Sequence, residues 1–257
     1  VTMSITAPAG WTATATSPAN FPSVAGGQTV KTTWQITAPG SAAAATYPFS
    51  ATATTSAGTR TDVGQTSVPY ASLSAAYNNV GISDDHNTGA ANLDGGGLSY
   101  SAQALAAAGL ASGGTVQHDG LTFTWPTSGG GQLDNVLTGG QSVLLDGSGG
   151  KLGFIGTGDS GPPSGGGTIV YTDGTTQQFA LGFNDWWQSP SIPGEDVVAA
   201  LPYLNNGGGQ QTQKVNMYYS SVPLQAGKTI SVVTLPNVTS VATQGQPKLH
   251  VFAIAVG

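Results

Sequence analysis

Hydrophobic and polar residues alternate along most of this chain in short runs, and most runs end at a glycine or a proline. Val1, Met3 and Ile5 begin the pattern, which returns at Trp34 and Ile36. A period of two is typical of a half-buried β-strand, because successive side chains of a strand point to opposite faces. The pattern therefore predicts an all-β protein.

Two regions of such runs are separated by a short uncharged segment. Residues 1–68 hold runs that recur about every ten residues, which predicts a small β-sandwich with Trp11 and Trp34 in its core. Residues 69–77 contain two tyrosines and no charge, and we interpret them as a short packed linker. Residues 78–257 hold about ten further runs joined by hairpin-length turns, which fits a larger jelly-roll sandwich.

Two stretches of the larger region depart from simple alternation. Residues 99–110, SYSAQALAAAGL, predict one short alanine-rich helix of about three turns that ends at Gly109. Residues 249–257, LHVFAIAVG, are nearly all apolar, as in a buried central strand.

Residues 168–183 predict a β-hairpin around Asp173-Gly174, the dipeptide that favours a two-residue type I′ turn. With that turn, Thr168 pairs with Phe179. One face then carries the core residues Thr168, Val170, Phe179, Leu181 and Phe183.

Composition and charge narrow the possible partners. Glycine (39) and proline (15) are abundant, but the recurring apolar residues favour a folded chain over a disordered one. The net charge is −6 and the six basic residues are scattered, so neither nucleic acid nor an anionic membrane surface is an expected partner. Low charge with much Ser, Thr and Gly predicts a secreted, extracellular protein. Because the chain begins at Val1 within a strand and shows no signal peptide, we interpret it as a mature or excised segment.

Several classes of chemistry find no support in the sequence. Cysteine is absent, so disulfides and thiol chemistry are excluded. Glycoside hydrolysis needs two carboxyls that flank the bond, but the acids of the pairs Asp84-Asp85 and Glu195-Asp196 are adjacent and point to opposite sides of an extended chain. Most other aspartates lie beside glycine, a combination that is common in turns, so their presence needs no catalytic role. We predict no catalytic residue and no required cofactor.

Residues 158–162, GDSGP, overlap the sequence motif around the nucleophile of chymotrypsin-like proteases. That chemistry needs a histidine base and a buried aspartate. His86 and His118 lie in a polar loop and a turn, and Pro162 stands where the protease phrase has a second glycine. A glycine- and proline-rich loop is the better interpretation.

Hard oxygen ligands gather in one loop, at Asp84, Asp85, Asn87 and Asp94. Ca²⁺ takes six to eight such oxygens, partly from backbone carbonyls, so the loop is a candidate site for a structural calcium ion. An Asx-rich surface loop without metal is the competing interpretation.

Aromatic residues beside amides and a carboxylate are candidates for carbohydrate binding, because sugar C–H faces stack on rings while hydroxyls need polar partners. The candidates are Asp185, Trp186, Trp187, Tyr203, Asn205, Asn206, Tyr218 and Tyr219. Neighbours such as Trp186 and Trp187 cannot both face inward on a regular strand. Packing against another domain, or closure of the sandwich end, is the alternative use of these rings.

The first region resembles the NEW3 type of immunoglobulin-like domain. The resemblance rests on PAGW at residues 8–11, FPSVAGGQTV at 21–30, Thr46-Tyr47 and the Thr/Ala strand at 50–55. It implies an immunoglobulin-like spacer that accompanies glycoside hydrolases.

The second region resembles a module found near the C-terminus of secreted bacterial glycoside hydrolases. The matching phrases are YNNVGISDD, NLDGGGLSYSAQALAAAGL, VYTDGTTQQFALGFNDW, SVPLQAGKTISVVTLP and LHVFAIAVG. The resemblance implies a galactose-binding-like β-sandwich beside a catalytic domain of the same parent chain, with glycan as an expected ligand.

The sequence therefore predicts the non-catalytic accessory region of a secreted bacterial glycoside hydrolase, which binds carbohydrate or positions the catalytic module. Two alternatives stay open. One is a purely structural domain pair that docks on the catalytic domain. The other is a stand-alone hydrolase with an unrecognised site.

Overall fold

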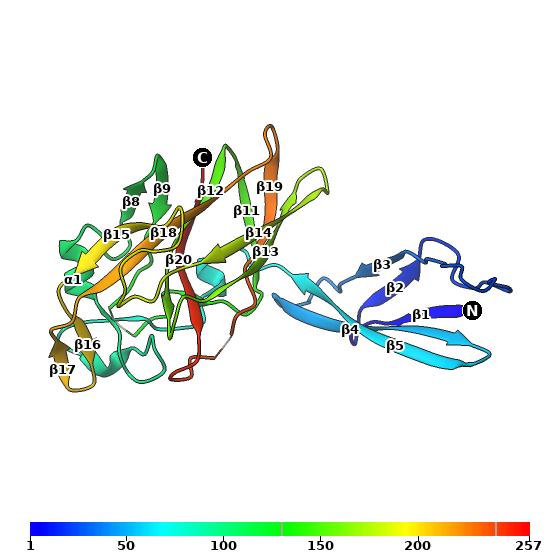
Figure 1. The fold of residues 1–257 in the computed structure, drawn as a ribbon, viewed down its shortest axis with the longest axis horizontal. Helices are drawn as coiled ribbons and strands as arrows, with labels where there is room; N and C mark the ends of the chain where they lie inside the picture. The colour runs from blue at the N-terminus through cyan, green and yellow to red at the C-terminus, as the bar shows by residue number, and fades with distance from the viewer. Residues whose placement is uncertain (130, 240) are drawn as a thin grey trace. The chain divides into compact units, whose positions relative to one another are not determined.

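The computed structural model describes residues 1–129, 131–239 and 241–257, and it is built mainly of β-strands (Figure 1). The chain divides into two compact units, Val1–Pro69 and Tyr70–Gly257. Each unit is built of layered and mostly antiparallel sheets, so the predicted all-β fold is confirmed.

The first unit is a small sandwich of two sheets. One sheet has the order β1 (Thr2–Thr6), β4 (Ala45–Thr55) and β5 (Gly58–Val68), and the other pairs β2 (Thr12–Ala15) with β3 (Trp34–Thr37). β4 and β5 pair along their whole length, from Thr55 opposite Gly58 to Ala45 opposite Val68.

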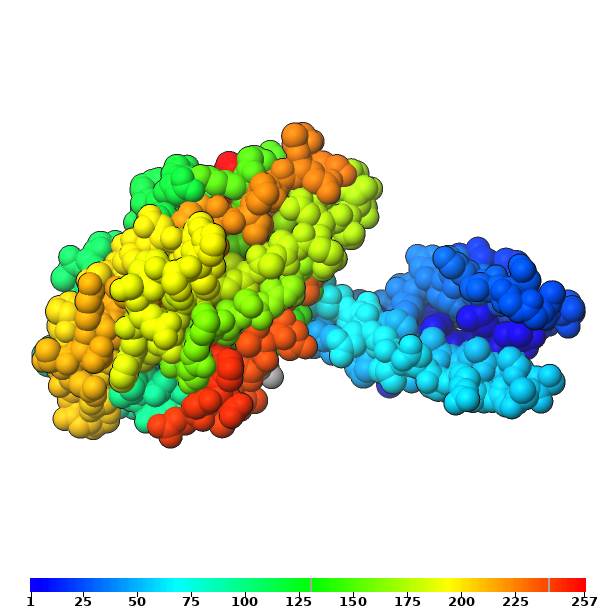
Figure 2. All heavy atoms as spheres, in the orientation of Figure 1, coloured from blue at the N-terminus to red at the C-terminus, as the bar shows by residue number. Residues whose placement is uncertain are grey.

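The core of the first unit is thin. Both predicted core tryptophans are only partly buried, and the Trp11 ring packs against Tyr47 with 4.7 Å between ring centroids. A hollow of about 320 Å³ is lined by Met3, Trp34 and Arg60, among others. Figure 2 shows this hollow with β1 (dark blue) at its floor. The threonine- and alanine-rich strands therefore leave this core partly open to solvent.

The second unit is a jelly-roll sandwich. Its five-stranded sheet has the order β10 (Val136–Leu137), β20 (Lys248–Val256), β12 (Lys151–Asp159), β18 (Val215–Pro223) and β15 (Asp196–Leu201). Its four-stranded sheet has the order β11 (Ser142–Ser148), β19 (Thr229–Thr234), β13 (Ser164–Tyr171) and β14 (Thr176–Gly182). The strands β10 to β13 alternate between the two sheets, which is the jelly-roll arrangement. The fold prediction for this region is confirmed.

The five-stranded sheet is buried on both faces. Leu249 of β20 faces the four-stranded sheet within one apolar cluster, and Phe252 belongs to a second cluster on the opposite face. That opposite face is covered by α1 (Ala102–Ala107) and by the hairpin of β8 (Thr115–His118) and β9 (Leu121–Thr124). Burial on two faces explains why β20 is apolar at nearly every position.

The segment interpreted as a linker packs within the second unit from Tyr70 onward. Tyr70 forms a parallel bridge with Val143, and its backbone exchanges hydrogen bonds with β11. Leu73 and Ala76 are buried in the core between the sheets. The apolar side chains of this short stretch account for its packing.

The predicted helix is present but shorter than expected. Ser101 caps it, since its hydroxyl accepts a hydrogen bond from Ala104 N–H, and the chain leaves the helix near Gly109, where φ is +93°. The residues before Ala102 are strand, because β7 (Tyr100–Ser101) pairs in parallel with β6 (Ile82–Ser83).

The register predicted for the β13–β14 hairpin is wrong by one residue. Thr168 pairs with Gln178, so Thr168 and Val170 lie on the outer face while Ile169 and Tyr171 are buried. Of the turn residues only Gly174 has positive φ, at +81°, whereas a type I′ turn needs two such residues. The Asp173 side chain instead accepts hydrogen bonds from the backbone N–H and the hydroxyl of Thr175, which favours a three-residue loop. The β14 half of the prediction is correct, since Phe179 and Leu181 are buried.

Candidate functional site

The structure separates the two neighbouring tryptophans that the sequence singled out. Trp186 is 1% exposed, lies edge-on to Tyr100 with 5.0 Å between ring centroids, and donates a 3.2 Å hydrogen bond from Nε1 to Asp159. Trp187 is 44% exposed. Trp186 therefore closes the core, and Trp187 is the ring of this pair that a ligand can reach.

Both tyrosines of the other pair are buried. The Tyr218 hydroxyl donates to the backbone oxygen of Asp185 at 2.9 Å, and the Tyr219 hydroxyl donates to Asp119 Oδ2 at 2.8 Å. Tyr219 also packs its ring against His118 of the β8–β9 hairpin, with 4.7 Å between centroids. Burial raises the pKa of each tyrosine to about 12, so both hydroxyls act as donors. Their rings serve packing.

The carboxylate of Asp185 is held by its own loop. Its Oδ2 accepts a hydrogen bond from Gly161 N–H at 3.0 Å, and its Oδ1 accepts one from Trp187 N–H at 3.1 Å. Beside it, Lys248 is fully buried and lies 2.7 Å from Asp159 Oδ2. These contacts fix the loops at this end of the sandwich.

The protease-like phrase forms part of the same loop structure. Ser160, in the left-handed region at φ +59°, donates its hydroxyl hydrogen bond to Asp159 at 2.8 Å. The histidines have other partners, namely Asp84 for His86, Asp196 for His118 and Asn135 for His250. The arrangement is that of a loop between strands.

The four residues predicted as metal ligands have separate partners. Asp84 accepts hydrogen bonds from His86 and Gln103. The Asp94 carboxylate accepts from Gly96 and Leu98 N–H, and Asn87 begins a 3-10 turn. Within the described residues no three acidic, histidine or cysteine side chains are grouped as metal ligands.

Asp85 instead meets two of the residues predicted to bind sugar. Its Oδ2 accepts a 2.7 Å hydrogen bond from the Tyr203 hydroxyl, and its Oδ1 accepts a 3.0 Å hydrogen bond from Asn205 Nδ2. Asn206, by contrast, turns into the hairpin of β16 (Leu204–Asn206) and β17 (Gly209–Gln211), where it donates to Gln211. Asp85, Tyr203 and Asn205 are therefore held together, and Asn206 is not part of this contact.

The two carboxylates of the adjacent pair Glu195-Asp196 also have different partners. Glu195 accepts hydrogen bonds from the backbone and side-chain nitrogens of Asn184. Asp196 lies 3.1 Å from His118 Nε2. In both adjacent pairs, Asp84-Asp85 and Glu195-Asp196, the two carboxylates therefore bind different partners.

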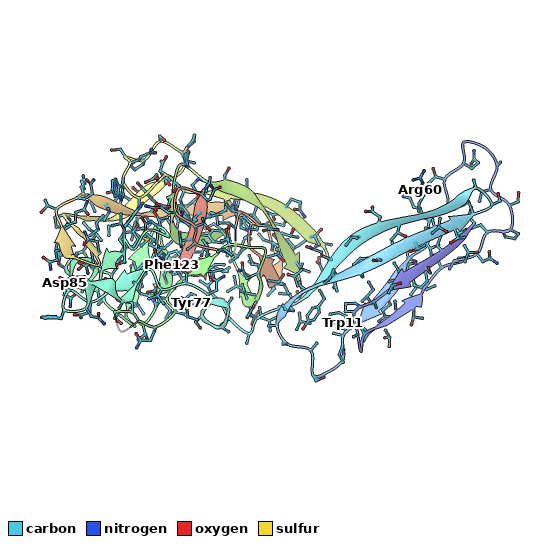
Figure 3. The ribbon with its side chains drawn as sticks, turned by 90° about the horizontal axis from the view of Figure 1, so that it is seen from below. Trp11, Arg60, Tyr77, Asp85 and Phe123 are labelled. Carbon is cyan, nitrogen blue, oxygen red and sulfur yellow. The ribbon has the colours of Figure 1, made fainter. Side chains whose placement is uncertain are left out.

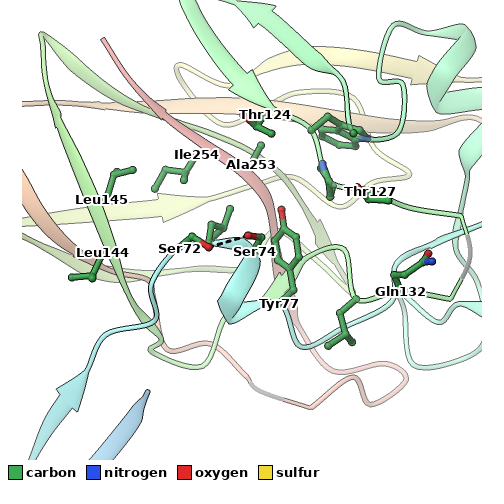
Figure 4. Close-up of a pocket in the computed structure, with 15 residues that line it drawn as sticks. Ser72, Ser74, Tyr77, Thr124, Thr127, Gln132, Leu144, Leu145, Ala253 and Ile254 are labelled. Atoms are coloured by element: carbon green, nitrogen blue, oxygen red, sulfur yellow. Dashed lines mark hydrogen bonds between the residues drawn. The ribbon is translucent and has the colours of Figure 1, made fainter. Parts of the chain in front are cut away.

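Sequence reasoning missed a groove in the second unit, with a volume of about 630 Å³. Figure 4 shows Leu144 and Leu145 on one side, Thr127 and Gln132 on the other, and Tyr77 and Ser74 between them. The lining residues are Ser72, Leu73, Ser74, Tyr77, Gly113, Thr124, Trp125, Pro126, Thr127, Gln132, Leu133, Leu144, Leu145, Ala253 and Ile254. None of them carries a charge. Leu133 and Leu144 are 52% and 48% exposed, an unusual exposure for leucine, and they mark the groove.

Two rings of the groove are held firmly. The Tyr77 hydroxyl donates a 2.7 Å hydrogen bond to the backbone oxygen of Phe252. Trp125 stacks on the Phe252 ring with 5.6 Å between centroids, and its buried Nε1 has no hydrogen-bond partner among the described residues. A preformed groove of this size with aromatic, aliphatic and hydroxyl lining suits a small neutral ligand.

A buried polar chain of Asp134, Asn135 and His250 also escaped sequence reasoning. Asn135 donates from Nδ2 to Asp134 Oδ1 at 2.7 Å, and its Oδ1 lies 2.8 Å from His250 Nδ1. All three residues are fully buried. Burial, and then the charge of Lys248, lower the pKa of His250 to about 3. Burial raises the pKa of Asp134 to about 7 against the effect of its hydrogen bonds.

These two residues give stability opposite dependences on pH. In the unfolded chain His250 takes up a proton below pH ~6.5, whereas in the folded chain it stays neutral down to about pH 3. The contribution of His250 to the free energy of unfolding is therefore lost as the pH falls from ~6.5 to about 3. Asp134 is protonated more readily in the folded chain than in the unfolded one. Its contribution to the free energy of unfolding is therefore fully present below pH ~3.9 and is lost as the pH rises through about 7.

We expect His250→Gln to change the pH profile of stability. Between pH 6 and 4.5 the free energy of unfolding of wild type should fall relative to the variant by about 1.4 kcal/mol per pH unit. Urea unfolding at several pH values measures it. His86→Gln is the matched control, because the His86 side chain is 91% exposed, and it should follow wild type. Parallel wild-type and His250→Gln profiles would contradict the assignment.

The family comparison covers the first unit. Residues 1–56 match the model of the NPCBM-associated NEW3 domain of alpha-galactosidase. The NEW3 resemblance drawn from the sequence is thereby confirmed for this part of the chain. No curated protein matches the chain. Within the described residues no helix is long and apolar enough to cross a membrane.

Proposed function

We propose that this chain is the non-catalytic accessory region of a secreted glycoside hydrolase, and that its second unit binds neutral carbohydrate in the groove beside Tyr77. The observation that carries the proposal is the uncharged groove of about 630 Å³, in a chain whose first 56 residues match a glycosidase-associated domain. The catalytic module then belongs to the same parent protein.

The lining of the groove has the chemistry that a sugar needs. A pyranose offers a C–H face, which packs on rings and aliphatic side chains, and hydroxyls, which need donors and acceptors. Tyr77, Leu144 and Ile254 supply apolar surface, and Thr124 and Ser74 supply hydroxyls. The absence of charge from the lining favours a neutral sugar over a uronic acid or a phosphorylated ligand.

Titration calorimetry of the whole chain tests binding. The probes are oligosaccharides of galactomannan, mannan, xylan and galactan. We expect one saturable site per chain for at least one of them. Heats at the level of dilution for every probe, together with a measurable loss of activity when the region is removed from its parent enzyme, would favour a purely structural role.

Groove variants locate the site. We expect Leu133→Asp and Leu144→Asp each to weaken retention on the bound polysaccharide at least tenfold, because a carboxylate at the groove is desolvated by the sugar. Both leucines are about half exposed, so the fold should tolerate the changes. Affinity electrophoresis measures the effect.

Two matched controls complete that comparison. Val241→Asp changes an exposed apolar residue, at 63% exposure, that is not part of the groove, and it should bind like wild type. Trp187→Ala removes the exposed ring at the other candidate position. If Trp187→Ala loses retention while the leucine variants keep it, the tryptophan loop is the binding site and the groove is not.

A further inference from the structure

A second hollow in the surface of the second unit adjoins the groove. It has a volume of about 470 Å³ and is lined in part by α1 and in part by the segment that follows β9. Thr127 and Gln132 line both the groove and this hollow, so the two are continuous. We call it the side hollow. Its lining also includes Asp84, Gln103, Ala106 and Ser128.

The side hollow extends the groove toward one end of the second unit. Figure 4 shows Thr127 and Gln132 on the side of the groove that lies away from Leu144. Figure 3 shows Tyr77, which lines the groove, well apart from Asp85, the neighbour of Asp84, which lies near the end of the unit. A ligand that fills both hollows therefore has to be long.

Each hollow alone is large enough for a small ligand. Pockets for small molecules have volumes of about 300–1,000 Å³, and the groove, at about 630 Å³, and the side hollow, at about 470 Å³, both lie in this range. A single sugar ring in the groove would leave the side hollow to water. Several linked rings would cover both hollows and bury more apolar surface.

The side hollow is more polar than the groove, because a carboxylate and an amide lie in it. Gln103 Nε2 donates a 2.7 Å hydrogen bond to Asp84 Oδ2, and Gln103 Oε1 accepts one of 3.0 Å from Asp85 N–H. Asp84 Oδ1 accepts a hydrogen bond from the backbone N–H of His86 at 2.8 Å and lies 2.9 Å from its ring Nδ1. These contacts fix both planar groups before a ligand arrives.

Asp84 and Gln103 keep hydrogen-bonding capacity for a ligand. An ionised carboxylate accepts at about four lone-pair sites, and the contacts with His86 and Gln103 use at most three of those of Asp84. An amide nitrogen has two N–H groups, of which the bond to Asp84 uses one. One acceptor at Asp84 and one donor at Gln103 therefore suit a pair of neighbouring sugar hydroxyls.

The charge of Asp84 selects among polymers. Hydrogen bonds, first from the backbone N–H of His86 and then from the Gln103 side chain, hold the pKa of Asp84 below its usual value. The carboxylate is therefore ionised at neutral pH and repels acidic sugars. Since the lining of the groove carries no charge, the two hollows together favour a neutral chain.

Both ends of this path are open to solvent. Leu144 at the groove end is 48% exposed, and the side chain of Asp84 at the other end is 35% exposed. A chain can therefore continue past both ends. An enclosed pocket, by contrast, would accept only a chain terminus or a free monosaccharide.

We propose that the groove and the side hollow together bind an internal stretch of a linear, neutral polysaccharide. The inference rests on the proposed carbohydrate binding in the groove and adds the form of the ligand. One part of the chain packs on the apolar side chains beside Tyr77, and the following units pass Thr127 and Gln132 to reach Asp84 and Gln103.

Titration calorimetry of the whole chain with ligands of increasing length tests the proposal. The probes are manno-, xylo- and galacto-oligosaccharides of one to six units. In the series that binds, we expect the affinity to rise at least tenfold from two units to five, because the longer chain also fills the side hollow. Reduction of the terminal unit to its alditol should leave the affinity of the six-unit ligand unchanged.

Ala106→Arg blocks the side hollow and leaves the groove as it is. Ala106 is exposed on α1, and arginine is a good helix former whose cation is attracted by Asp84. We expect at least a tenfold loss of affinity for the five-unit ligand and less than a twofold change for the two-unit ligand. Ala107→Arg is the matched control, because Ala107 is exposed on the same helix but lines neither hollow. It should bind both ligands like wild type.

The outcomes separate this inference from the proposed function. Equal affinities for two and five units, both lost in Leu144→Asp, would leave sugar binding in the groove but overturn the extended site. Equal effects of Ala106→Arg and Ala107→Arg on the five-unit ligand would overturn it too. A loss of affinity on reduction of the terminal unit would mean that the site recognises a chain end. Binding of none of the probes would overturn both proposals.

Discussion

Replacing Trp186 with alanine is expected to lower the free energy of unfolding by about 3–5 kcal/mol. The ring is 1% exposed, and the substitution leaves a cavity beside Tyr100 in the core under the five-stranded sheet. It also removes the hydrogen bond that Nε1 donates to Asp159, a carboxylate that is almost wholly buried. Urea unfolding followed by circular dichroism measures the change.

The adjacent tryptophan gives the control within the same loop. Trp187 is 44% exposed, so Trp187→Ala should cost no more than about 1 kcal/mol. If the two variants lose similar stability, the distinction between a core residue at 186 and a surface residue at 187 is wrong.

Replacing Lys248 with methionine is expected to cost about 3–5 kcal/mol, because it leaves Asp159 as a buried carboxylate without its cation. The Lys248 side chain is 0% exposed, lies 2.7 Å from Asp159, and donates to the backbone oxygens of Thr243 and Gln246. Adding Asp159→Asn to the same chain should recover part of the loss, since the uncompensated charge is then gone.

Lys228→Met is the matched control for the buried ion pair. Lys228 pairs with Asp173 at 3.1 Å on the surface, where both side chains are partly exposed. Pairs of that kind contribute about 0–1 kcal/mol. If Lys248→Met and Lys228→Met lower the free energy of unfolding in urea by equal amounts, the buried ion pair is no more important for stability than the exposed one, and the prediction is wrong.

Much of the fold was predictable because it depends on local patterns. Alternation marks strands wherever one face is buried, and the nearly apolar run at 249–257 correctly indicated a central strand. The hairpin at Asp173-Gly174 was located, but its register was not. Two hydrogen bonds from Thr175 to the Asp173 side chain decide between turn types, and a dipeptide rule does not include them.

The sites were less predictable, because burial depends on which distant segments cover a strand. Tyr219 looks like a ligand-binding ring in the sequence, but the β8–β9 hairpin covers it. The groove draws its lining from segments around residues 72–77, 113–133, 144–145 and 253–254. No local motif brings these together. Asp85 and Asn205 were each singled out, but for different sites, because their contact spans 120 positions of the chain.

The NEW3 match concerns the first unit only. A match over residues 1–56 associates the first unit with an alpha-galactosidase domain family. The groove lies in the second unit, between Tyr70 and Gly257. The proposed division is therefore a spacer followed by a binding module.

One affinity gel tests the central claim most directly, with wild type, Leu144→Asp, Val241→Asp and Trp187→Ala run side by side in gels of galactomannan, mannan, xylan and galactan and in a gel without polysaccharide. We expect at least one of these polysaccharides to retard wild type, Val241→Asp and Trp187→Ala equally, while Leu144→Asp migrates in it as it does without polysaccharide. Equal retardation of all four proteins, or retardation of none in any neutral polysaccharide, would contradict carbohydrate binding in the groove.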